Sequence, residues 1–366
     1  MQFCRTKSFA VPSDELAVMF PLPQAGEGRI HRILWTNKVK ILLIRVSSLG
    51  DVLHNMPMVD DIKAHYPDAQ IDWVVEEAYV NLVKLQPKVN KVIAYAQRRW
   101  RKSLGNKETR AEIKHFYRTL REEAYDFIFD TQGLLKTGII MGMARKSANG
   151  KKVGLANGTE GSGYEGISRI FHDVSIPVDR RTHAVLRGRL VAAAALNYQV
   201  DTPASFGLQK LDLQPAWMPA TPYIVFFHGT AGESKKWSRN NWISTARDLQ
   251  VTGWPILLPW GSEAEKREAE AMAEHMSNAQ VLPKLSMQEA TVLAQKAALV
   301  IGVDTGLVHI AAAYETPTIE IYCDSPKWKT EGNWSDKIIN LGDKGSPPSV
   351  AEVEIAFERL LNKKSD

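Results

Sequence analysis

The segment 47–54 places a carboxylate where acid–base chemistry is possible. It reads Ser-Ser-Leu-Gly-Asp-Val-Leu-His and directly follows a β-prone run at 39–46. In a doubly wound α/β domain, the turn after the first strand points into the ligand crevice at the carboxyl ends of the strands. The G-x-G-x-x-G dinucleotide pattern is absent, and one glycine (Gly50) and one carboxylate (Asp51) stand in its place. Asp51 is therefore a candidate general base, and a plain helix cap explains its position equally well.

A second chemical group follows the apolar run 298–303, where the sequence is Asp-Thr-Gly-Leu-Val-His. A helix that begins here offers free N–H groups to a phosphate, and Gly306 permits a close approach of the backbone. Capping of that helix by Asp304 or Thr305 is the alternative. His309 lies within the first turns of the same helix, and together with Thr305 and Gly306 it exceeds what a cap needs. We therefore expect a phosphate site here.

Charged side chains follow two other predicted strand ends. Lys235 comes shortly after the strand 223–227 and the segment that ends at Thr230. A lysine on such a loop supplies a mobile point charge for a phosphate, although a solvated loop lysine is equally consistent. Glu265 begins a charged helix after a Pro-Trp-Gly turn and could accept ribose hydroxyls, although most such glutamates face solvent.

The basic residues of this 366-residue chain are clustered, although the net charge is only +5. Nine basic residues and two acidic ones, Glu108 and Glu112, lie between Arg98 and Arg121. This patch suits phosphates, nucleic acid or an anionic membrane surface, and a solvated helix face is the plain alternative. Trp100, set among cations, favours an interface. The longest apolar runs fall well short of the roughly 18–20 residues that span a bilayer, and two distant cysteines indicate a reducing, cytoplasmic setting.

The elements that must position these groups alternate between strand and helix, which predicts parallel sheets. Residues 1–38 show no sustained period, so we expect a disordered leader or a true start further along the chain. A first Rossmann-like, acceptor-binding domain is expected over 39–200, with helices at about 52–65 and 107–123 and a long irregular loop at 150–183. A proline-rich linker covers 201–222, and a second Rossmann-like, nucleotide-sugar-binding domain covers 223–366. The predicted fold is thus α/β, with two such domains facing across a cleft.

Taken together, these motifs resemble the bacterial lipopolysaccharide heptosyltransferases, the ADP-heptose transferases of glycosyltransferase family 9. The resemblance runs in order from about residue 39 to 322 and is specific as a set. The matching pieces are the 47–54 turn, Asp72-Trp73-Val74-Val75-Glu76-Glu77, Arg98-Arg99-Trp100-Arg101-Lys102, Asp130-Thr131-Gln132-Gly133-Leu134, the 235–237 loop, Leu258-Pro259-Trp260-Gly261 and Asp304-Thr305-Gly306-Leu307-Val308-His309. In place of the family's Gly-Pro-Thr-like turn, this chain has Cys323-Asp324-Ser325-Pro326, which puts donor contacts there in doubt.

The resemblance implies a GT-B fold and an inverting glycosyl transfer without metal or other cofactor. The donor would be ADP-L-glycero-D-manno-heptose, and the acceptor the first Kdo sugar of Kdo2-lipid A, at the cytoplasmic face of the inner membrane. Asp51 would be the catalytic base. The implied donor-binding residues are Thr230, Lys235, Glu265, Asp304, Thr305, Gly306 and His309. The implied acceptor-binding residues are Ser48, Gly50, Arg98, Arg99, Arg101, Lys102 and Gln132.

Two alternatives stay open at this point. Heptosyltransferase II or another GT-B transferase would keep the phosphate apparatus and change the donor sugar or the acceptor. A nucleic-acid-binding protein could use the basic patch, but it would need stacking aromatics or a groove-reading helix. Only Trp100 and Tyr117 lie near the charges, so this second alternative is distant.

Overall fold

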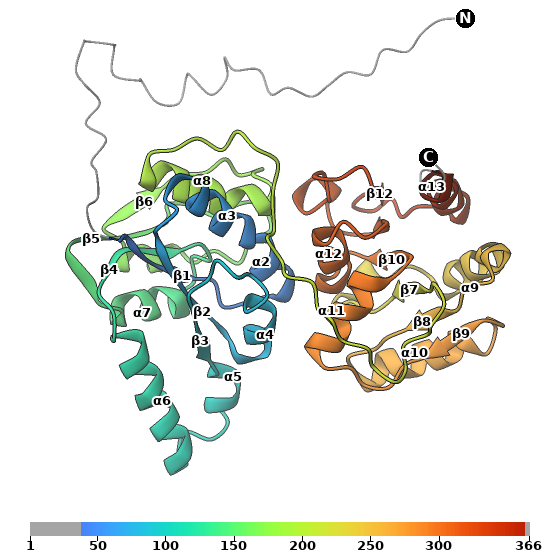
Figure 1. Cartoon of the computed structure of the whole chain (residues 1–366), viewed down its shortest axis with the longest axis horizontal. Helices are drawn as coiled ribbons and strands as arrows, with labels where there is room; N and C mark the ends of the chain where they lie inside the picture. The colour runs from blue at the N-terminus through green and yellow to red at the C-terminus, as the bar shows by residue number, and fades with distance from the viewer. Residues whose placement is uncertain (1–37, 363–366) are drawn as a thin grey trace, which may run out of the picture. The chain divides into compact units, whose positions relative to one another are not determined.

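Two parallel six-stranded sheets form the framework of the protein (Figure 1). The computed structural model describes residues 38–362, so the expected leader lies outside the described residues, except for Lys38. Both sheets belong to one compact unit, Lys38–Asp366. We call the part built on the first sheet the N-terminal lobe and the part built on the second the C-terminal lobe. The domain limits at 200 and 223 stay a prediction.

The two sheets share one strand order. In the N-terminal lobe the order is β3-β2-β1-β4-β5-β6, and in the C-terminal lobe it is β12-β11-β10-β7-β8-β9. The strands can be numbered one to six along the chain within each lobe. Read from its other edge, the second sheet then has the order 3-2-1-4-5-6, which is also the order of the first sheet. The strands of the first sheet are β1 (Lys40–Ile44), β2 (Gln70–Glu76), β3 (Lys91–Tyr95), β4 (Tyr125–Asp130), β5 (Lys146–Leu155) and β6 (Val174–Ile176). Those of the second are β7 (Ile224–Phe227), β8 (Ile256–Leu258), β9 (Ala279–Val281), β10 (Leu299–Val303), β11 (Thr318–Tyr322) and β12 (Ile338–Gly342). The α/β class and the paired Rossmann-like arrangement are confirmed.

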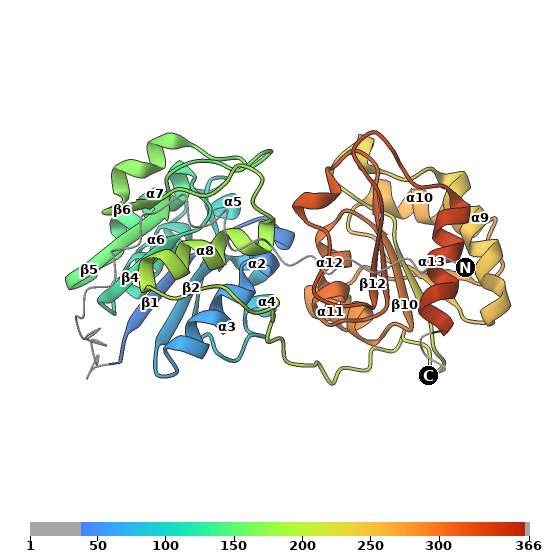
Figure 2. The same cartoon turned by 90° about the horizontal axis from the view of Figure 1, so that it is seen from above.

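Helices cover both faces of each sheet. Those of the N-terminal lobe are α2 (Leu49–His54), α3 (Met56–His65), α4 (Val80–Val83), α5 (Gln97–Trp100), α6 (Lys107–Leu120), α7 (Leu135–Met143) and α8 (Ala184–Leu196), with 3-10 turns η1 (Glu77–Tyr79) and η2 (Gly166–Phe171). Those of the C-terminal lobe are α9 (Arg239–Asp248), α10 (Glu263–Ala273), α11 (Met287–Lys296), α12 (Gly306–Ala313) and α13 (Val350–Asn362), with η3 (Glu233–Lys235), η4 (Leu249–Thr252) and η5 (Lys327–Lys329). Figures 1 and 2 show α3 and α8 on one side of the first sheet and α5, α6 and α7 on the other.

Alternation along β1 explains how its two faces are covered, because successive strand side chains point to opposite faces. Ile41 and Leu43 belong to the core under α3 and α8, whereas Leu42 and Ile44 belong to the core under α5, α6 and α7. The first of these cores continues into the C-terminal lobe, where Val308 of α12 is also part of it. Helix α2 packs directly on α12, so the two lobes share apolar packing as well as a cleft.

Two local expectations from the sequence are corrected by the structure. Residues 150–183 are not one irregular loop, because β5, η2 and β6 occupy much of the segment. The polar, glycine-rich composition reflects strands toward the edge of the sheet, and only the last part of β5, from Val153, is continuously buried. The expected helix at 52–65 is two helices, α2 and α3, that meet at Asn55. Pro57 lies in the first turn of α3, where its missing N–H costs no hydrogen bond.

Candidate active site

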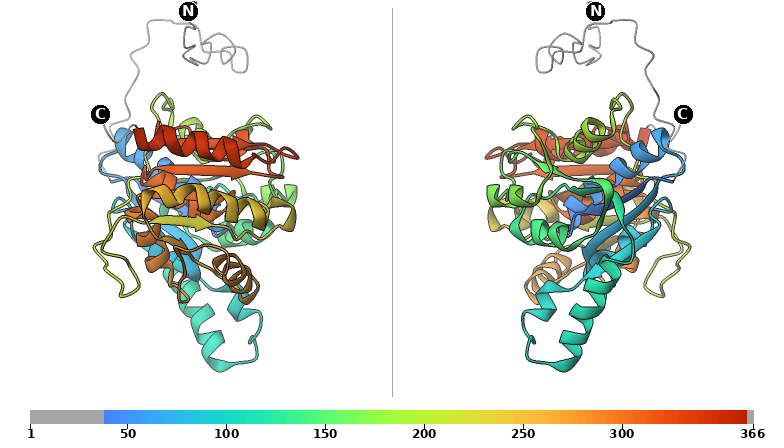
Figure 3. Two further views of the ribbon diagram at one scale, coloured as in Figure 1. Left: turned by 90° about the vertical axis from the view of Figure 1, so that its right-hand side faces the viewer. Right: turned by 90° about the vertical axis from the view of Figure 1, so that its left-hand side faces the viewer.

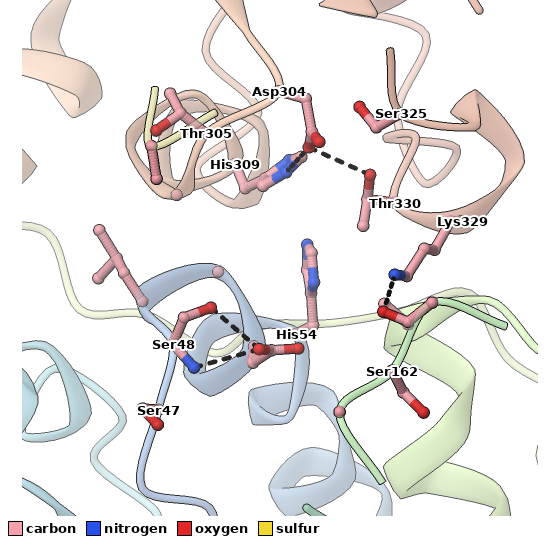
Figure 4. A pocket seen from close by; sticks show the side chains of 18 of the residues that line it. Ser47, Ser48, His54, Ser162, Asp304, Thr305, His309, Ser325, Lys329 and Thr330 are labelled. Atoms are coloured by element: carbon pink, nitrogen blue, oxygen red, sulfur yellow. Dashed lines mark hydrogen bonds and ion pairs between the residues drawn. The ribbon is translucent and has the colours of Figure 1, made fainter. Parts of the chain in front are cut away.

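A cavity of about 790 Å³ opens between the two lobes at the carboxyl ends of their strands. In each sheet the chain reverses its order between the first and the fourth strand, β1 and β4 in one lobe and β7 and β10 in the other. Ligands of doubly wound sheets bind at this switch point. The cavity is lined from both switch points, by Asp51 and Gln132 on one side and by Thr230 and Asp304 on the other. Figure 4 shows Ser48 and His54 facing Asp304 and His309 across it.

Asp51 performs the capping role and also faces the cavity. Its Oδ2 accepts hydrogen bonds from the backbone N–H and the hydroxyl of Ser48, at 3.1 and 2.9 Å, which secures the first turn of α2. Its Oδ1 lies 2.5 Å from an Arg45 nitrogen and 3.5 Å from Arg187. The Asp51 side chain remains 37% exposed. The two interpretations of the sequence are therefore compatible, because the two oxygens have different tasks.

The charges around Asp51 keep its carboxylate ionised. Burial favours the neutral acid, but Arg45, Arg187 and the Ser48 N–H outweigh it and hold the pKa of Asp51 well below its usual range. The arginines approach from β1's end and from α8, and both are almost fully buried. Asp51 is consequently available as a proton acceptor throughout the neutral range, at a position where two cations also attract an anionic ligand.

Gln132 fixes the turn that carries Asp51. Its side-chain oxygen accepts a hydrogen bond from the Val46 N–H at 3.0 Å, and its amide nitrogen donates to the Ser47 hydroxyl at 3.3 Å. Lys136 of α7 donates to the same hydroxyl at 3.2 Å. Gln132 comes from the end of β4, the neighbour of β1. Gln132, which follows β4, thus holds the turn that follows β1.

Asp304 is the carboxylate of the opposite side, and its oxygens are fully engaged. Oδ2 receives Lys235 Nζ at 2.7 Å, and Oδ1 lies 3.2 Å from His309 Nε2 and 3.4 Å from the Thr330 hydroxyl. The side chain is only 10% exposed. Burial opposes ionisation, yet His309 and Lys235 bring the pKa of Asp304 well below its usual range.

His309 continues this network into the core of the C-terminal lobe. Its Nδ1 lies 3.1 Å from Glu320 Oε1, and the other Glu320 oxygen accepts hydrogen bonds from Tyr322 and from the Gly332 N–H. Burial disfavours a charged imidazole, but Glu320 and Asp304 on either side raise the pKa of His309 to about 10. Lys235, Asp304, His309 and Glu320 form a chain of alternating charge with no net charge.

The start of α12 has the features of a phosphate site. Thr305 is its N-cap residue and makes no side-chain capping hydrogen bond, so its hydroxyl and the first helical N–H groups are available to an anion. Thr230 donates its hydroxyl to the Asp304 carbonyl at 3.3 Å, and Lys235 reaches the same rim from η3. The sequence-predicted Thr305, Gly306, Lys235, Thr230 and Asp304 are brought together here.

Gly50 and Gly306 lie where α2 and α12 meet. A Cβ on Gly306 would come within 2.7 Å of Leu49 Cγ, and one on Gly50 would lie 3.5 Å from His309 Cδ2. The His54 ring lies beside that of His309, with centroids 4.7 Å apart. Both glycines line the cavity as expected, but they also permit the close approach of the two helices, a role that the sequence did not indicate.

Five sequence-predicted site residues do not line the cavity. Glu265 closes a capping box on α10, accepting from the N–H groups of Gly261 and Ser262 at 2.7 and 3.1 Å. Its carboxyl group nevertheless lies against the backbone of Gly229, next to Thr230. The other four, Arg98, Arg99, Arg101 and Lys102, are exposed at and after α5.

Trp100 is not an interfacial aromatic, contrary to the expectation from its cationic neighbours. It is buried against Tyr95 and Phe116, and its indole N–H donates to Glu112 at 2.7 Å. Arg99 pairs with Glu112 as well, at 2.8 Å. The tryptophan therefore anchors α5 to α6 and leaves the adjacent cations exposed.

Sequence reasoning missed several cations and hydroxyls that line the cavity. Arg45 and Arg187 interrupt apolar runs that are otherwise buried, and a charged residue in such a run is a signal of a functional position. Lys329 spans the cavity and donates to the Gly161 carbonyl at 2.9 Å (Figure 4). The loop after β11, where the sequence departs from the family pattern, also contributes Ser325 and Thr330. No local pattern indicated these, because they reach the cavity only through the fold.

Two general features of residues 38–362 complete the description. No three or more histidine, cysteine, aspartate or glutamate side chains within them are grouped so that they could hold a metal ion. None of their helices combines the length and apolar character that crossing a bilayer requires.

Comparison with known proteins identifies the family. A profile of glycosyltransferase family 9 (heptosyltransferase) matches residues 113–356. The chain belongs to glycosyltransferase family 9. Lipopolysaccharide heptosyltransferase 1 of Pseudomonas aeruginosa is 36% identical over 285 residues, 78% of each chain, and that of Salmonella typhimurium is 34% identical over 78% of this chain and 88% of its own.

Solved structures of the family have the same fold as this heptosyltransferase. The E. coli heptosyltransferase WaaC with ADP is 29% identical and has a TM-score of 0.77, covering 88% of this chain and all of its own. WaaC with ADP-2-deoxy-2-fluoro heptose is 28% identical and has a TM-score of 0.70 over 89% of this chain. The GT-B expectation is thereby confirmed.

Proposed function

We propose that this family 9 enzyme transfers L-glycero-D-manno-heptose from ADP-heptose to the first Kdo sugar of Kdo2-lipid A, with inversion and without a metal ion. One observation carries the proposal: a partly exposed carboxylate, Asp51, and a phosphate-suited helix start at Thr305 line a single cavity from opposite lobes. Lipopolysaccharide heptosyltransferase 1 relatives at 33–36% identity support the acceptor.

Asp51 is the proposed general base. The acceptor hydroxyl attacks the anomeric carbon of the heptose, the bond from that carbon to the β-phosphate oxygen breaks, and ADP leaves with the electron pair. The hydroxyl proton passes to the Asp51 carboxylate. Because Arg45 and Arg187 hold the pKa of Asp51 low, it is a weak base, and it takes the proton once bonding to carbon has made the hydroxyl acidic.

The C-terminal lobe stabilises the leaving diphosphate in this proposal. Lys235 is partly exposed at the cavity rim and moves from Asp304 to the phosphates, while the N–H groups at the start of α12 bind the same anion. Lys329 adds a second cation from the loop after β11. Glu265, beside Gly229, is proposed to hold the ribose after it leaves its cap.

The acceptor enters from the side of the N-terminal lobe. Arg98, Arg99, Arg101 and Lys102 are exposed and meet the carboxylates and phosphates of Kdo2-lipid A in the proposal. Figure 3 shows α6 extending away from the first sheet. The basic residues of α6 are exposed and thus open to a large anionic ligand: Lys107, Arg110, Lys114 and Arg118. Peripheral attachment to the cytoplasmic face of the inner membrane follows from the same charges.

The proposal is tested with purified protein, ADP-heptose and Kdo2-lipid A, with and without EDTA. We expect turnover in both conditions. Asp51→Ala is expected to abolish turnover and to retain ADP binding, measured by calorimetry. Loss of activity in EDTA would contradict the metal-independent mechanism. Normal turnover by Asp51→Ala would contradict the assignment of Asp51 as the base.

A second acceptor separates this activity from that of heptosyltransferase II. Kdo2-lipid A that already carries one heptose is offered under the same conditions. We expect transfer to the unheptosylated acceptor only. Transfer to the heptosylated acceptor alone would place the enzyme at the next step of core assembly and would leave the phosphate site as described.

A further inference from the structure

Exposed apolar side chains gather on one face of the N-terminal lobe, the face covered by α6, α7 and η2. Ile170 is 71% exposed and Ile167 56%, both on η2, and Ile170 lines a hollow together with the exposed Ile139 of α7. Leu104, just before α6, and Tyr117 of α6 are also exposed and line a second hollow together with Met143. A soluble surface carries scattered single apolar residues, but a grouped set marks a contact surface.

The isoleucines of η2 are held in place by packing underneath them. Phe171 lies against α7 where Gly138 and Gly142 leave room; a Cβ on either would come within 2.6 or 2.8 Å of the Phe171 ring. Packing of Phe171 on α7 therefore fixes the position of η2, and with it the exposed side chains of Ile167 and Ile170.

Two hollows open on this face and share one lining residue, Met143. One, of about 540 Å³, lies between α5 and α6, with Tyr95 and Phe116 in its wall. The other, of about 500 Å³, lies between α7 and η2, with Ile139 and Ile170 in its wall. Because the two hollows adjoin at Met143, we treat the apolar side chains along them as one strip.

Cations surround this strip. Arg101, Arg110 and Lys114 line the first hollow, and Lys146 and Lys152 line the second. Asp173 is the one acidic residue among the residues that line the two hollows, and Lys146 pairs with it at 2.7 Å. An apolar centre with a basic border complements a surface of acyl chains and phosphate headgroups.

The strip also begins at the active site. Leu134 lines the catalytic cavity, the exposed Leu135 follows it at the start of α7, and Lys136 donates to Ser47 beside Asp51. A bilayer in contact with α7 and η2 would therefore lie next to the cavity entrance on the N-terminal lobe.

We infer that this α6–α7–η2 face docks on an anionic phospholipid bilayer, with Ile139, Ile167 and Ile170 entering the acyl boundary and the surrounding cations meeting the phosphates. The inference rests on the proposed function, because a membrane-held acceptor gives the contact its purpose. Attachment through charges alone would be weakened by salt. The docking face adds an apolar contact to those charges.

The test compares two double variants of the full chain. Ile167→Ser with Ile170→Ser removes the apolar ridge, and Val251→Ser with Ile355→Ser removes equally exposed apolar groups, 82% and 66% exposed, from the C-terminal lobe. Each is sedimented with vesicles of phosphatidylcholine, with or without phosphatidylglycerol. We expect the first pair to lower the partition coefficient on phosphatidylglycerol vesicles about tenfold or more, and the second to leave it unchanged.

Turnover on a deacylated, water-soluble acceptor checks the fold of each variant and separates the two proposals. If the wild-type protein turns over none of the acceptors while the two double variants still differ in vesicle binding, the proposed function alone is contradicted. Equal sedimentation of the two double variants would overturn the docking face, as would wild-type binding to pure phosphatidylcholine as strong as to the anionic mixture.

Discussion

The two switch points of this heptosyltransferase each present one carboxylate surrounded by cations, yet the two carboxylates differ in what they can do. Asp51 follows β1, the first strand of its sheet, lines the cavity and has a side chain that is 37% exposed. Asp304 follows β10, the fourth strand of its sheet, and all its contacts are internal. The same strand order therefore places a partly exposed carboxylate, the proposed proton acceptor, in one lobe and a nearly buried carboxylate in the other.

The partners explain the difference. Asp51 is balanced by arginines, whose guanidinium groups stay charged and can also bind an incoming anion. Asp304 is balanced by Lys235 and by His309, and His309 is itself fixed by the buried Glu320. Position in the fold is thus not enough to assign a role, because the exposure of the two carboxylates and the chemistry of their partners differ.

Replacing the partly exposed Asp51 carboxylate should have the largest effect, and mainly on the rate. Asp51→Asn keeps the shape of the side chain and removes the proton acceptor, so kcat should fall about 10²- to 10⁴-fold. The free energy of urea unfolding should fall less than in Asp304→Asn, because the Asn oxygen can still accept from the Ser48 N–H and the Asp51 side chain, 37% exposed, is partly screened by solvent. A variant that unfolds much more easily than wild type would mean that Asp51 is an anchor like Asp304.

Asp304→Asn should reverse that pattern. It leaves Lys235 and the buried, charged His309 without their shared partner, and breaking a buried pair costs about 3–5 kcal/mol. Urea unfolding monitored by circular dichroism measures the loss. If Asp304→Asn unfolds like wild type and only turnover falls, the division of roles between the two carboxylates fails.

The His309 network predicts a pH dependence of stability confined to the C-terminal side. Its pKa is raised from 6.5 to about 10, so its contribution is fully present below pH 6.5 and is lost as the pH rises toward 10. Unfolding free energies across that range should fall more steeply in wild type than in His309→Gln. His115→Gln, at an exposed site on α6, serves as the control and should follow wild type.

The smallest effect is expected from the two glycines at the α2–α12 contact. Gly306→Ala places a Cβ 2.7 Å from Leu49 Cγ, and overpacking of this kind costs about 1–3 kcal/mol. Gly50→Ala meets His309 only at 3.5 Å, an ordinary contact, so it should be tolerated. Thermal unfolding of the pair measures the contrast, and equal melting temperatures would show that the helices are free to separate.

Local patterns were sufficient for most of the framework. The apolar run that ends before Ser47, the run at 298–303 and the helix at Lys107–Leu120 are found where periodicity predicted them. Local patterns failed at β6, the edge strand, and at its neighbour β5, because neither strand is buried over most of its length and so both resemble a loop in composition. They also failed at Trp100, whose burial depends on contacts with Tyr95 and Phe116 that no local window contains.

The sequence by itself determined the α/β class, the Asp51 turn and the phosphate-suited start of α12, because each depends on residues that are neighbours in the chain. Tertiary structure alone decided what surrounds them. Arg45, Arg187 and Lys329 come from three distant segments and meet at one cavity. Charge, burial and proton affinity arise from groups that are close in space, so they exist only once the two sheets are folded and packed together.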